Sequence, residues 1–597
     1  MSTSKALQRA EASFAARRWA EAIVACRDLA AADPDDARVP ALAGAALLQA
    51  GRYAEAVTQL ERSVSLAPRV VQPRIDLGLA LLVLRRVSEA EASFRVATSI
   101  QPSSAEAWAN LGDALAGQRR WDEALEAYAA ALRLRPEHAR VLNNRGNVHR
   151  ELGKGELAVR DYRASTSTDP SFALAWSNLS AALAAQREFS ASLEAAREAV
   201  LLQPGSALAI SQLALALRDG GQVDEALEAA ERAVAIAPRS PRAVFNRAWL
   251  LEDVGRRREA FEGFERTLEL EPANPEAALA RAHALLREGR YREGWAGYDA
   301  RTRGRGWSIS APPGLPLLQG PGAVGDVAIV AEQALGDTIQ FARFGRQIEA
   351  AGLRAVLRCA PRLVRLLSTA PGFIEARGHG EERTDSAEVA WFPLMSVPRL
   401  LGLDTERDIA APPYLRGEPG RSSHWREWLA ARVVPGELRV GIAWQGNPKT
   451  ERANLLGRSW PLAVLAPLAR LPNVRLVCLQ RGPGLDQLEH AEFSSDLLVP
   501  GPNFDDGPDA FIDSAALMES LDAIVTSDSA VAHLAGALGR PTLIGLHHRA
   551  DWRWGAGGKT TTWYPTAILY RQTRRGDWRD VVDAIAGELV RRSAVQL

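Results

Sequence analysis

Small and apolar side chains recur in the first half of the chain with a period of 34 residues. In one such period, Trp108 and Gly112 fall on one predicted helix, and Ala124 and Tyr128 fall on a second helix that would pack against it. A proline closes every period: Pro34, Pro68, Pro102, Pro136, Pro170, Pro204, Pro238 and Pro272. Because proline cannot donate the hydrogen bond of the next turn, each one is expected to end a second helix. The pattern predicts stacked antiparallel helix pairs over residues 1–300.

This period is the length of the tetratricopeptide repeat (TPR), so we expect a right-handed solenoid with a concave face. A polar column runs through it, two residues before the small position of each first helix: Asp76, Asn110, Asn144, Asn178, Gln212 and Asn246. A primary amide both donates and accepts, which suits the backbone of an extended peptide. We interpret the column as peptide-binding, and the alternative is a set of solvated residues on helix surfaces. The column fails at Leu42 and Ala280.

The second half begins at about residue 305, and a Pro/Gly-rich stretch from Pro312 to Gly325 marks the boundary. Beyond it, short apolar runs alternate with amphipathic helices. The runs predict strands at Val327–Ala331, Ala355–Cys359, Leu438–Trp444, Val474–Gln480, Ala523–Ser527 and Thr542–Leu546. Strand–helix alternation in two blocks predicts two parallel-sheet, Rossmann-like lobes, residues 301–430 and 431–597. The expected fold class is therefore α + α/β. A final helix over Trp578–Arg592 is expected to pack across both lobes.

An incomplete ninth repeat precedes the first lobe and contains Tyr291, Trp295 and Tyr298. We expect these aromatic side chains to end the array and to dock it onto the next domain.

Composition excludes several partners. The 72 basic and 72 acidic residues balance, so nothing indicates nucleic acid or an anionic membrane surface. Cys26, Cys359 and Cys478 are too few and too widely spaced for a disulfide framework or a metal cluster. The first residues show no basic-then-apolar pattern, so we expect no leader peptide, and no uncharged apolar run reaches membrane-spanning length. We expect a cytoplasmic protein without membrane insertion.

Ligands of open parallel sheets bind at the carboxyl ends of the strands, so the turns there are the candidate site. After the first strand come Gly336, which permits a tight turn, and Asp337. Asp337 is either the N-cap of the next helix or a carboxylate that takes a proton from an incoming hydroxyl.

The turn after the third predicted strand reads GIAWQGNPK, with Trp444, Gly446, Asn447 and Lys449 as candidate ligand contacts. Only four lysines occur in the chain, so Lys449 is a candidate point charge for a phosphate. The alternative is an ordinary solvated loop lysine. Two residues a little further on, Arg458 and Ser459, extend the same anion site.

The third turn is the most specific, SDSAVAHLAGALGRP. Asp528 is expected to cap the helix, whose free amides at Ser529, Ala530 and Val531 would bind a phosphate. His533 lies one turn into this helix, where its neutral form is favoured, so it would donate a hydrogen bond without carrying charge. The alternative is a core histidine.

These motifs, with EQALGDTIQFARF, DWRW and WYP, resemble those of bacterial GT-B glycosyltransferases of the heptosyltransferase type over residues 290–575. The polar column is similar to the asparagine ladder of O-GlcNAc transferase. The resemblance implies inverting, metal-independent transfer from a nucleotide sugar and no further cofactor. In it, Asp337 would be the base, and Lys449 with the Ser529–His533 helix would hold the donor phosphate. The group usually has glycine at Ala334, where a methyl group would narrow the acceptor side.

TPR-linked members of this group include flagellin glycosyltransferases. The resemblance therefore implies a protein O-glycosyltransferase whose repeats capture flagellin, with a CMP-activated nonulosonic acid as donor. Two alternatives stay open: a transferase that acts on a lipid-linked envelope saccharide, and a TPR adaptor that has lost activity.

Overall fold

The computed structural model describes residues 3–596 apart from 304–310, 321, 323–324, 333, 382–387, 410–411 and 449–456. The chain forms two compact units, Met1–Pro238 and Arg239–Leu597. Helical repeats are followed by parallel sheets, so the predicted α + α/β class is confirmed. Across the described ranges, we find no helix with both the length and the hydropathy needed to span a bilayer.

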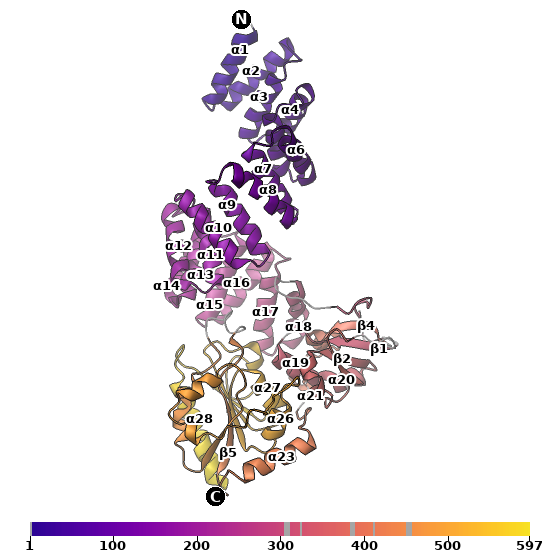
Figure 1. The fold of residues 1–597 in the computed structure, drawn as a ribbon, viewed down its shortest axis with the longest axis vertical. Helices are drawn as coiled ribbons and strands as arrows, with labels where there is room; N and C mark the ends of the chain where they lie inside the picture. Colours follow the sequence, from indigo (N-terminus) through magenta and orange to yellow (C-terminus); the bar gives the residue numbers. More distant parts are fainter. Residues whose placement is uncertain are drawn as a thin grey trace. The chain divides into compact units, whose positions relative to one another are not determined.

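The first unit is a succession of antiparallel helix pairs (Figure 1). Its helices are α1 (Thr3–Ala15), α2 (Trp19–Ala32), α3 (Arg38–Gln49), α4 (Tyr53–Leu66), α5 (Gln72–Val83), α6 (Val87–Ile100), α7 (Ala105–Gly117), α8 (Trp121–Leu134), α9 (Ala139–Glu151), α10 (Gly155–Thr168), α11 (Ala173–Ala185), α12 (Phe189–Leu202), α13 (Ala207–Asp219) and α14 (Val223–Ile236). The prolines end second helices as predicted: α8 ends at Leu134, Arg135 is its C-cap, and Pro136 follows.

The periodic glycines have a steric role. A Cβ atom added at Gly112 would lie 2.5 Å from the Tyr128 ring, and one at Gly146 would lie 2.8 Å from the Tyr162 ring. Both rings are buried. Each glycine therefore lets an aromatic side chain of the second helix lie directly against the backbone of the first, which explains why the small and large positions recur together.

Four further repeat-like helices belong to the second unit: α15 (Pro241–Asp253), α16 (Arg257–Leu270), α17 (Pro275–Arg287) and α18 (Tyr291–Tyr298). Trp295 of α18 makes edge-on contacts with Trp552 at 5.6 Å and with Phe341 at 6.2 Å, both measured between ring centroids. Tyr298 also contacts Trp552, at 5.7 Å. The aromatic side chains of the last repeat therefore dock it onto the α/β region, as predicted.

The first sheet has four parallel strands in the order β3-β2-β1-β4. They are β1 (Asp326–Val330), β2 (Arg354–Cys359), β3 (Glu375–Gly378) and β4 (Glu388–Pro393), with helices α19 (Leu335–Phe341), α20 (Gly345–Ala350), α21 (Val364–Leu367) and α22 (Val397–Leu400). The sequence predicted β1 and β2 to within a residue but not β3 and β4, which are shorter or less regular in their apolar pattern.

The second sheet has five parallel strands in the order β6-β5-β7-β8-β9. They are β5 (Leu438–Ala443), β6 (Val474–Cys478), β7 (Ala523–Ser527), β8 (Thr542–Leu546) and β9 (Ala567–Arg571), with helices α23 (Pro419–Ala430), α25 (Ala466–Ala469), α26 (Ile512–Met518), α27 (Ala530–Ala537) and α28 (Arg579–Gln596). Side chains of α28 join the core of this sheet, including Val581 and Ile585. The prediction that the final helix crosses both lobes is therefore wrong: its apolar face is buried on the second sheet.

Gly545 in β8 gives a direct test of this core. A Cβ atom there would lie 1.9 Å from the ring of Trp460, which is 1% exposed. We expect Gly545→Ala to destabilise the second unit by about 1–3 kcal/mol, because neither backbone can move away. Thermal unfolding followed by circular dichroism measures this. Gly557→Ala is the matched control, since a Cβ atom at Gly557 meets nothing within 4 Å. An equal shift for both variants would contradict the packing argument.

Candidate active site

The N-termini of α19 and α27 meet. Helix α19 follows β1 of the first sheet, and α27 follows β7 of the second sheet. A Cβ atom at Gly336 of α19 would lie 2.9 Å from His533 Cδ2 and 3.2 Å from the Cα atom of Ala530, both in α27. The φ angle of Gly336 is not positive, so its glycine is explained by this close approach and not by the predicted tight turn. The first turn of α19, which carries Asp337, therefore packs directly on the helix that carries His533.

Asp337 lies in the first turn of α19, whose N-cap is Ala334. The alternative that Asp337 is simply the N-cap is therefore wrong. Ala334 has φ −62° and ψ 162°, which any residue adopts, so alanine replaces the usual glycine without backbone strain. The Asp337 side chain remains 17% exposed, enough for a ligand to reach it.

Arg553 binds Asp337 across the two sheets. It follows β8, in the short helix η9 (Trp552–Trp554). Its guanidinium donates to Asp337 Oδ1 at 2.6 Å, to Gln340 Oε1 at 2.6 Å and to Asp551 Oδ1 at 2.8 Å. Arg553 stands in the DWRW motif, but no role was predicted for it from the sequence. An arginine two residues after an aspartate, just beyond a predicted strand, was the available signal.

The two carboxylates that Arg553 joins have different proton affinities. Burial raises the pKa of Asp337 and outweighs the lowering effect of Arg553. Burial would also raise the pKa of Asp551, but Arg553 and other charges hold it well below its usual value. Asp551 is therefore the permanent anion of the pair, and Asp337 is the better proton acceptor. Among the described residues, no group of three or more histidine, cysteine or acidic side chains is arranged to hold a metal ion.

His533 is a neutral histidine. Its Nδ1 atom lies 3.0 Å from the Tyr564 hydroxyl, and its ring stacks on Trp554 with centroids 5.5 Å apart. Burial, reinforced by the positive charge of Arg553, lowers the pKa of His533 to about 3. The imidazole is buried against the first turn of α19, as the alternative of a core histidine predicted. Its role in binding a ligand stays a prediction.

The N-cap of α27 is Ser529, so the prediction that Asp528 caps this helix is wrong. Asp528 is instead 4% exposed, and its Oδ2 atom lies 3.7 Å from Arg458 Nη1. Burial raises its pKa, and Arg458 opposes this rise. No described residue accepts a hydrogen bond from the backbone amides of Ser529, Ala530 or Val531. The start of α27 therefore offers free donors beside an arginine, which suits an anion.

The turn after β5 is held from several sides. The Gly446 amide donates to Ser459 Oγ at 2.9 Å, and Trp444 Nε1 donates to the Gly484 carbonyl at 3.2 Å. Trp444 has no exposed surface, so its side chain supports the loop and cannot contact a bound ligand. Asn447 is exposed beside Gly446. The predicted phosphate contact Lys449 lies outside the described residues.

Gln480 stabilises the same turn, a role that was not predicted from the sequence. Its Oε1 atom accepts from the amides of Trp444 and Gln445, each at 3.0 Å. Its Nε2 atom donates to the carbonyls of Gln445 and Pro483, each at 2.9 Å. The sequence carried no signal for this residue beyond its place after β6.

The polar column links neighbouring repeats. The Asn144 amide donates to Asp113 at 2.8 Å, Asn178 donates to Asn143 at 2.9 Å, and Gln212 donates to Ser180 at 3.3 Å. Asn110 accepts from Arg140 at 3.1 Å, while Asp76 accepts from Gln72 at 3.0 Å and burial raises its pKa to about 6. These side chains are buried or half-buried, so the solvated-surface alternative is wrong.

Asn246 is the member of the column in the second unit. It is 8% exposed, and its Nδ2 atom has no hydrogen-bond partner among the described residues. A buried amide donor without a partner is costly, so Asn246 has a donor left for a ligand or a water molecule.

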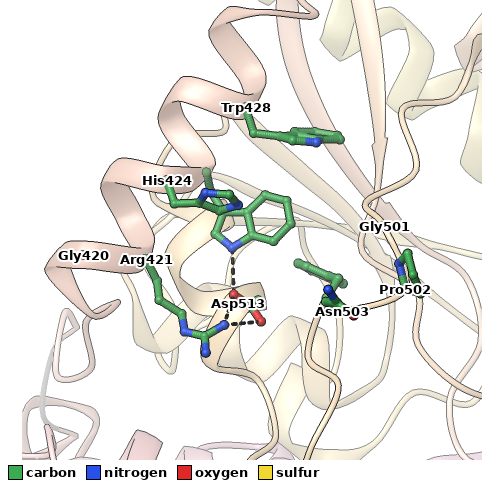
Figure 2. Close-up of a pocket in the computed structure, with 10 residues that line it drawn as sticks. Gly420, Arg421, His424, Trp428, Gly501, Pro502, Asn503 and Asp513 are labelled. Carbon is green, nitrogen blue, oxygen red and sulfur yellow. Dashed lines mark hydrogen bonds and ion pairs between the residues drawn. The ribbon is translucent and has the colours of Figure 1, made fainter.

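A separate pocket of about 390 Å³ lies between α23 and residues 501–504 (Figure 2). Trp425 and Phe504 form part of its wall in edge-on contact, 5.2 Å apart. Asp513 accepts from Trp425 Nε1 at 2.8 Å and from Arg421 at 2.6 Å. None of the predicted site residues lines this pocket.

Two protein-family models match the chain, one in the helical repeats and one in the region of the second sheet. The tetratricopeptide repeat model matches residues 41–105, 75–139, 109–173, 143–207 and 211–256. The model of glycosyltransferase family 9 (heptosyltransferase) matches residues 510–556, which include Asp528, His533 and Arg553. The resemblance to TPR-linked glycosyltransferases is thereby supported in both parts of the chain.

Protein FlbA of Caulobacter vibrioides is 27% identical over 177 residues, which is 30% of this chain and only 28% of FlbA. Solved structures match more loosely. The Cut9–Hcn1 hetero-tetramer of the APC/C covers 47% of this chain and 55% of its own, with 20% identity and a TM-score of 0.38. PilF of Pseudomonas aeruginosa covers 34% and 93%, with 22% identity and a TM-score of 0.31.

Proposed function

We propose that this chain, which joins TPR repeats to a segment of glycosyltransferase family 9, is an inverting protein O-glycosyltransferase with a GT-B catalytic half. It would transfer a sugar from a nucleotide-sugar donor to a serine or threonine hydroxyl of an acceptor protein bound by the repeats. The observation that carries the proposal is the close packing of the first turns of α19 and α27, because Asp337 stands in the first of these turns and His533 and the free amides belong to the second helix.

Asp337 is the base in this mechanism. Its carboxylate takes the proton of the acceptor hydroxyl as the oxygen forms a bond to the anomeric carbon. The bond from that carbon to the donor phosphate breaks on the opposite face, and its electron pair leaves with the nucleotide. A raised pKa suits this role, because a carboxylate that binds a proton more tightly is the stronger base.

The leaving phosphate would be stabilised at the start of α27. The amides of Ser529–Val531 and the guanidinium of Arg458 supply donors there, and neutral His533 can add a hydrogen bond without adding charge. Lys449 belongs to this proposal as a further cation. Preorganised donors of this kind supply the larger share of catalysis, because they need not reorganise as negative charge develops.

For substrates, we propose flagellin as the acceptor and a CMP-activated nonulosonic acid as the donor, with transfer in the cytoplasm and without a metal ion. Support comes from the combination of TPR repeats with a family 9 segment in one chain. An anionic sugar would also suit a site that contains Arg458 and Arg553.

Intact-mass spectrometry of flagellin tests the proposal, using cells with the gene, without it, and with Asp337→Ala. Loss of a sugar-sized mass in both altered strains would support the enzyme and its base. Loss of this mass in the deletion strain alone would mean that Asp337 has a structural role and is not the base. An unchanged flagellin in both strains would contradict flagellin as acceptor and direct the search to envelope saccharides or to an inactive adaptor.

The polar column gives a second prediction. Asn144→Ala with Asn178→Ala should raise the KM for the acceptor protein about 5- to 30-fold, because each removes hydrogen bonds of about 1 kcal/mol. Donor hydrolysis without acceptor should stay unchanged. The control is Glu126→Gln, an exposed position of α8. Since both asparagines also link repeats, the thermal midpoint must be measured in parallel. A lower midpoint with an unchanged KM would assign the column to stability alone.

A further inference from the structure

We infer that the last repeat helices help to position the catalytic carboxylate. Helices α15, α16 and α17 position the segment 549–556, and Arg553 within this segment positions Asp337. This inference rests on the proposed function, in which Asp337 is the base. A repeat helix ordinarily contacts only its neighbours in the array. These three helices contact the segment that leads out of β8.

The repeat helices hold both ends of the segment. Asp253, at the end of α15, forms an ion pair with Arg549, whose guanidinium also lies 5.3 Å from the centre of the Trp249 ring. Arg257, at the start of α16, donates to the carbonyl of Ala556. The Asp253 side chain is 6% exposed, so its pair with Arg549 is screened only weakly by solvent.

The middle of the segment contacts α17. The ring of His283 stacks on Trp552, with centroids 6.3 Å apart and an angle of 18°. Burial lowers the pKa of His283 to about 4, so this is a contact between a neutral ring and an indole. Arg553 is the next residue, and its guanidinium also lies 4.6 Å from the Trp552 ring.

The segment therefore has its ends and its centre fixed by repeat helices, and Arg553 projects from it to Asp337 at 2.6 Å. A guanidinium that bonds Asp337, Gln340 and Asp551 at once is directional, so a shift of its backbone changes the position of the Asp337 carboxylate. Asp253 and His283 are positioning residues in this scheme, since neither touches the reacting atoms.

Asp253→Asn in the full-length protein tests the link. Hydrogen–deuterium exchange should increase both in residues 549–556 and in residues 335–341, although the substitution is in neither. We expect kcat for donor turnover to fall about 2- to 30-fold, the range found for substitutions that act through a coupled network. The exchanged pair, Asp253→Arg with Arg549→Asp, should recover most of this loss.

The control is Glu262→Gln, on the exposed side of α16, where the carboxylate is 59% exposed and pairs with the exposed Arg258. It should leave both exchange and turnover unchanged. Increased exchange in residues 549–556 with none in residues 335–341 would overturn the inference. Increased exchange in both regions with an inactive wild-type protein would support the mechanical link and contradict the proposed function.

Discussion

Asp337→Asn is expected to lower kcat for sugar transfer by about 10²- to 10⁴-fold and to leave the KM for the donor nearly unchanged. Asparagine keeps the volume of the side chain but cannot take the proton from the hydroxyl of the acceptor protein. Arg553 retains Gln340 and Asp551 as partners, so the contact between the sheets should survive. Steady-state kinetics with saturating acceptor would measure the change.

The pH dependence distinguishes a base from a structural carboxylate. Because burial raises the pKa of Asp337, the wild-type kcat should rise with pH through a value above that of an ordinary aspartate. Below this pKa the carboxylate is protonated and cannot accept a proton, and Asp337→Asn should lack this acid limb. The control is Glu349→Gln at an exposed position of α20. A loss of less than about 10-fold with the acid limb intact would remove Asp337 from the chemistry.

Arg458→Gln is expected to lower kcat/KM for the donor by about 10²- to 10³-fold, the usual cost of removing one preorganised donor to a developing anion. The substitution removes the positive charge 3.7 Å from Asp528. The site should bind a phosphate less well because this positive charge is lost. Asp528 is buried, so its pKa should also rise further without Arg458.

Arg458→Lys should recover part of the affinity, because it restores the charge but not the planar guanidinium. Arg470→Gln is the matched control, since Arg470 is 72% exposed and pairs with the exposed Glu492. Isothermal titration with the nucleotide product measures binding without turnover. Equal affinities for Arg458→Gln and the wild type would place the donor phosphate elsewhere.

Much of the fold follows from short-range sequence patterns. The prolines predicted the ends of the second helices, and the apolar runs predicted β7 and β8 to the residue. Two strands end before the predicted residues Trp444 and Gln480. The predictions ran too far because both residues continue an apolar or buried run into the turn. Burial alone does not mark where strand pairing stops.

The candidate site was predictable only where its chemistry is local. Asp337 and His533 stand in compact motifs, whereas the partner of Asp337 lies 216 positions away on the other sheet. The order of strands in space decides such pairs, and sequence does not reveal that order. The polar column shows the same limit: its register is periodic, but the bonds from Asn144 to Asp113 and from Asn178 to Asn143 depend on how repeats stack.

The compact units divide at Pro238, and the first strand of the sheets begins only at Asp326. This position has a consequence for how such chains diversify. A recombination event near residue 300 would separate Asp253 and His283 from the segment that they contact. A crossover at Pro238 would exchange the preceding repeats and keep those contacts intact. New acceptor preferences could then be acquired by shuffling whole solenoids upstream of this proline, without renewed selection on the chemistry.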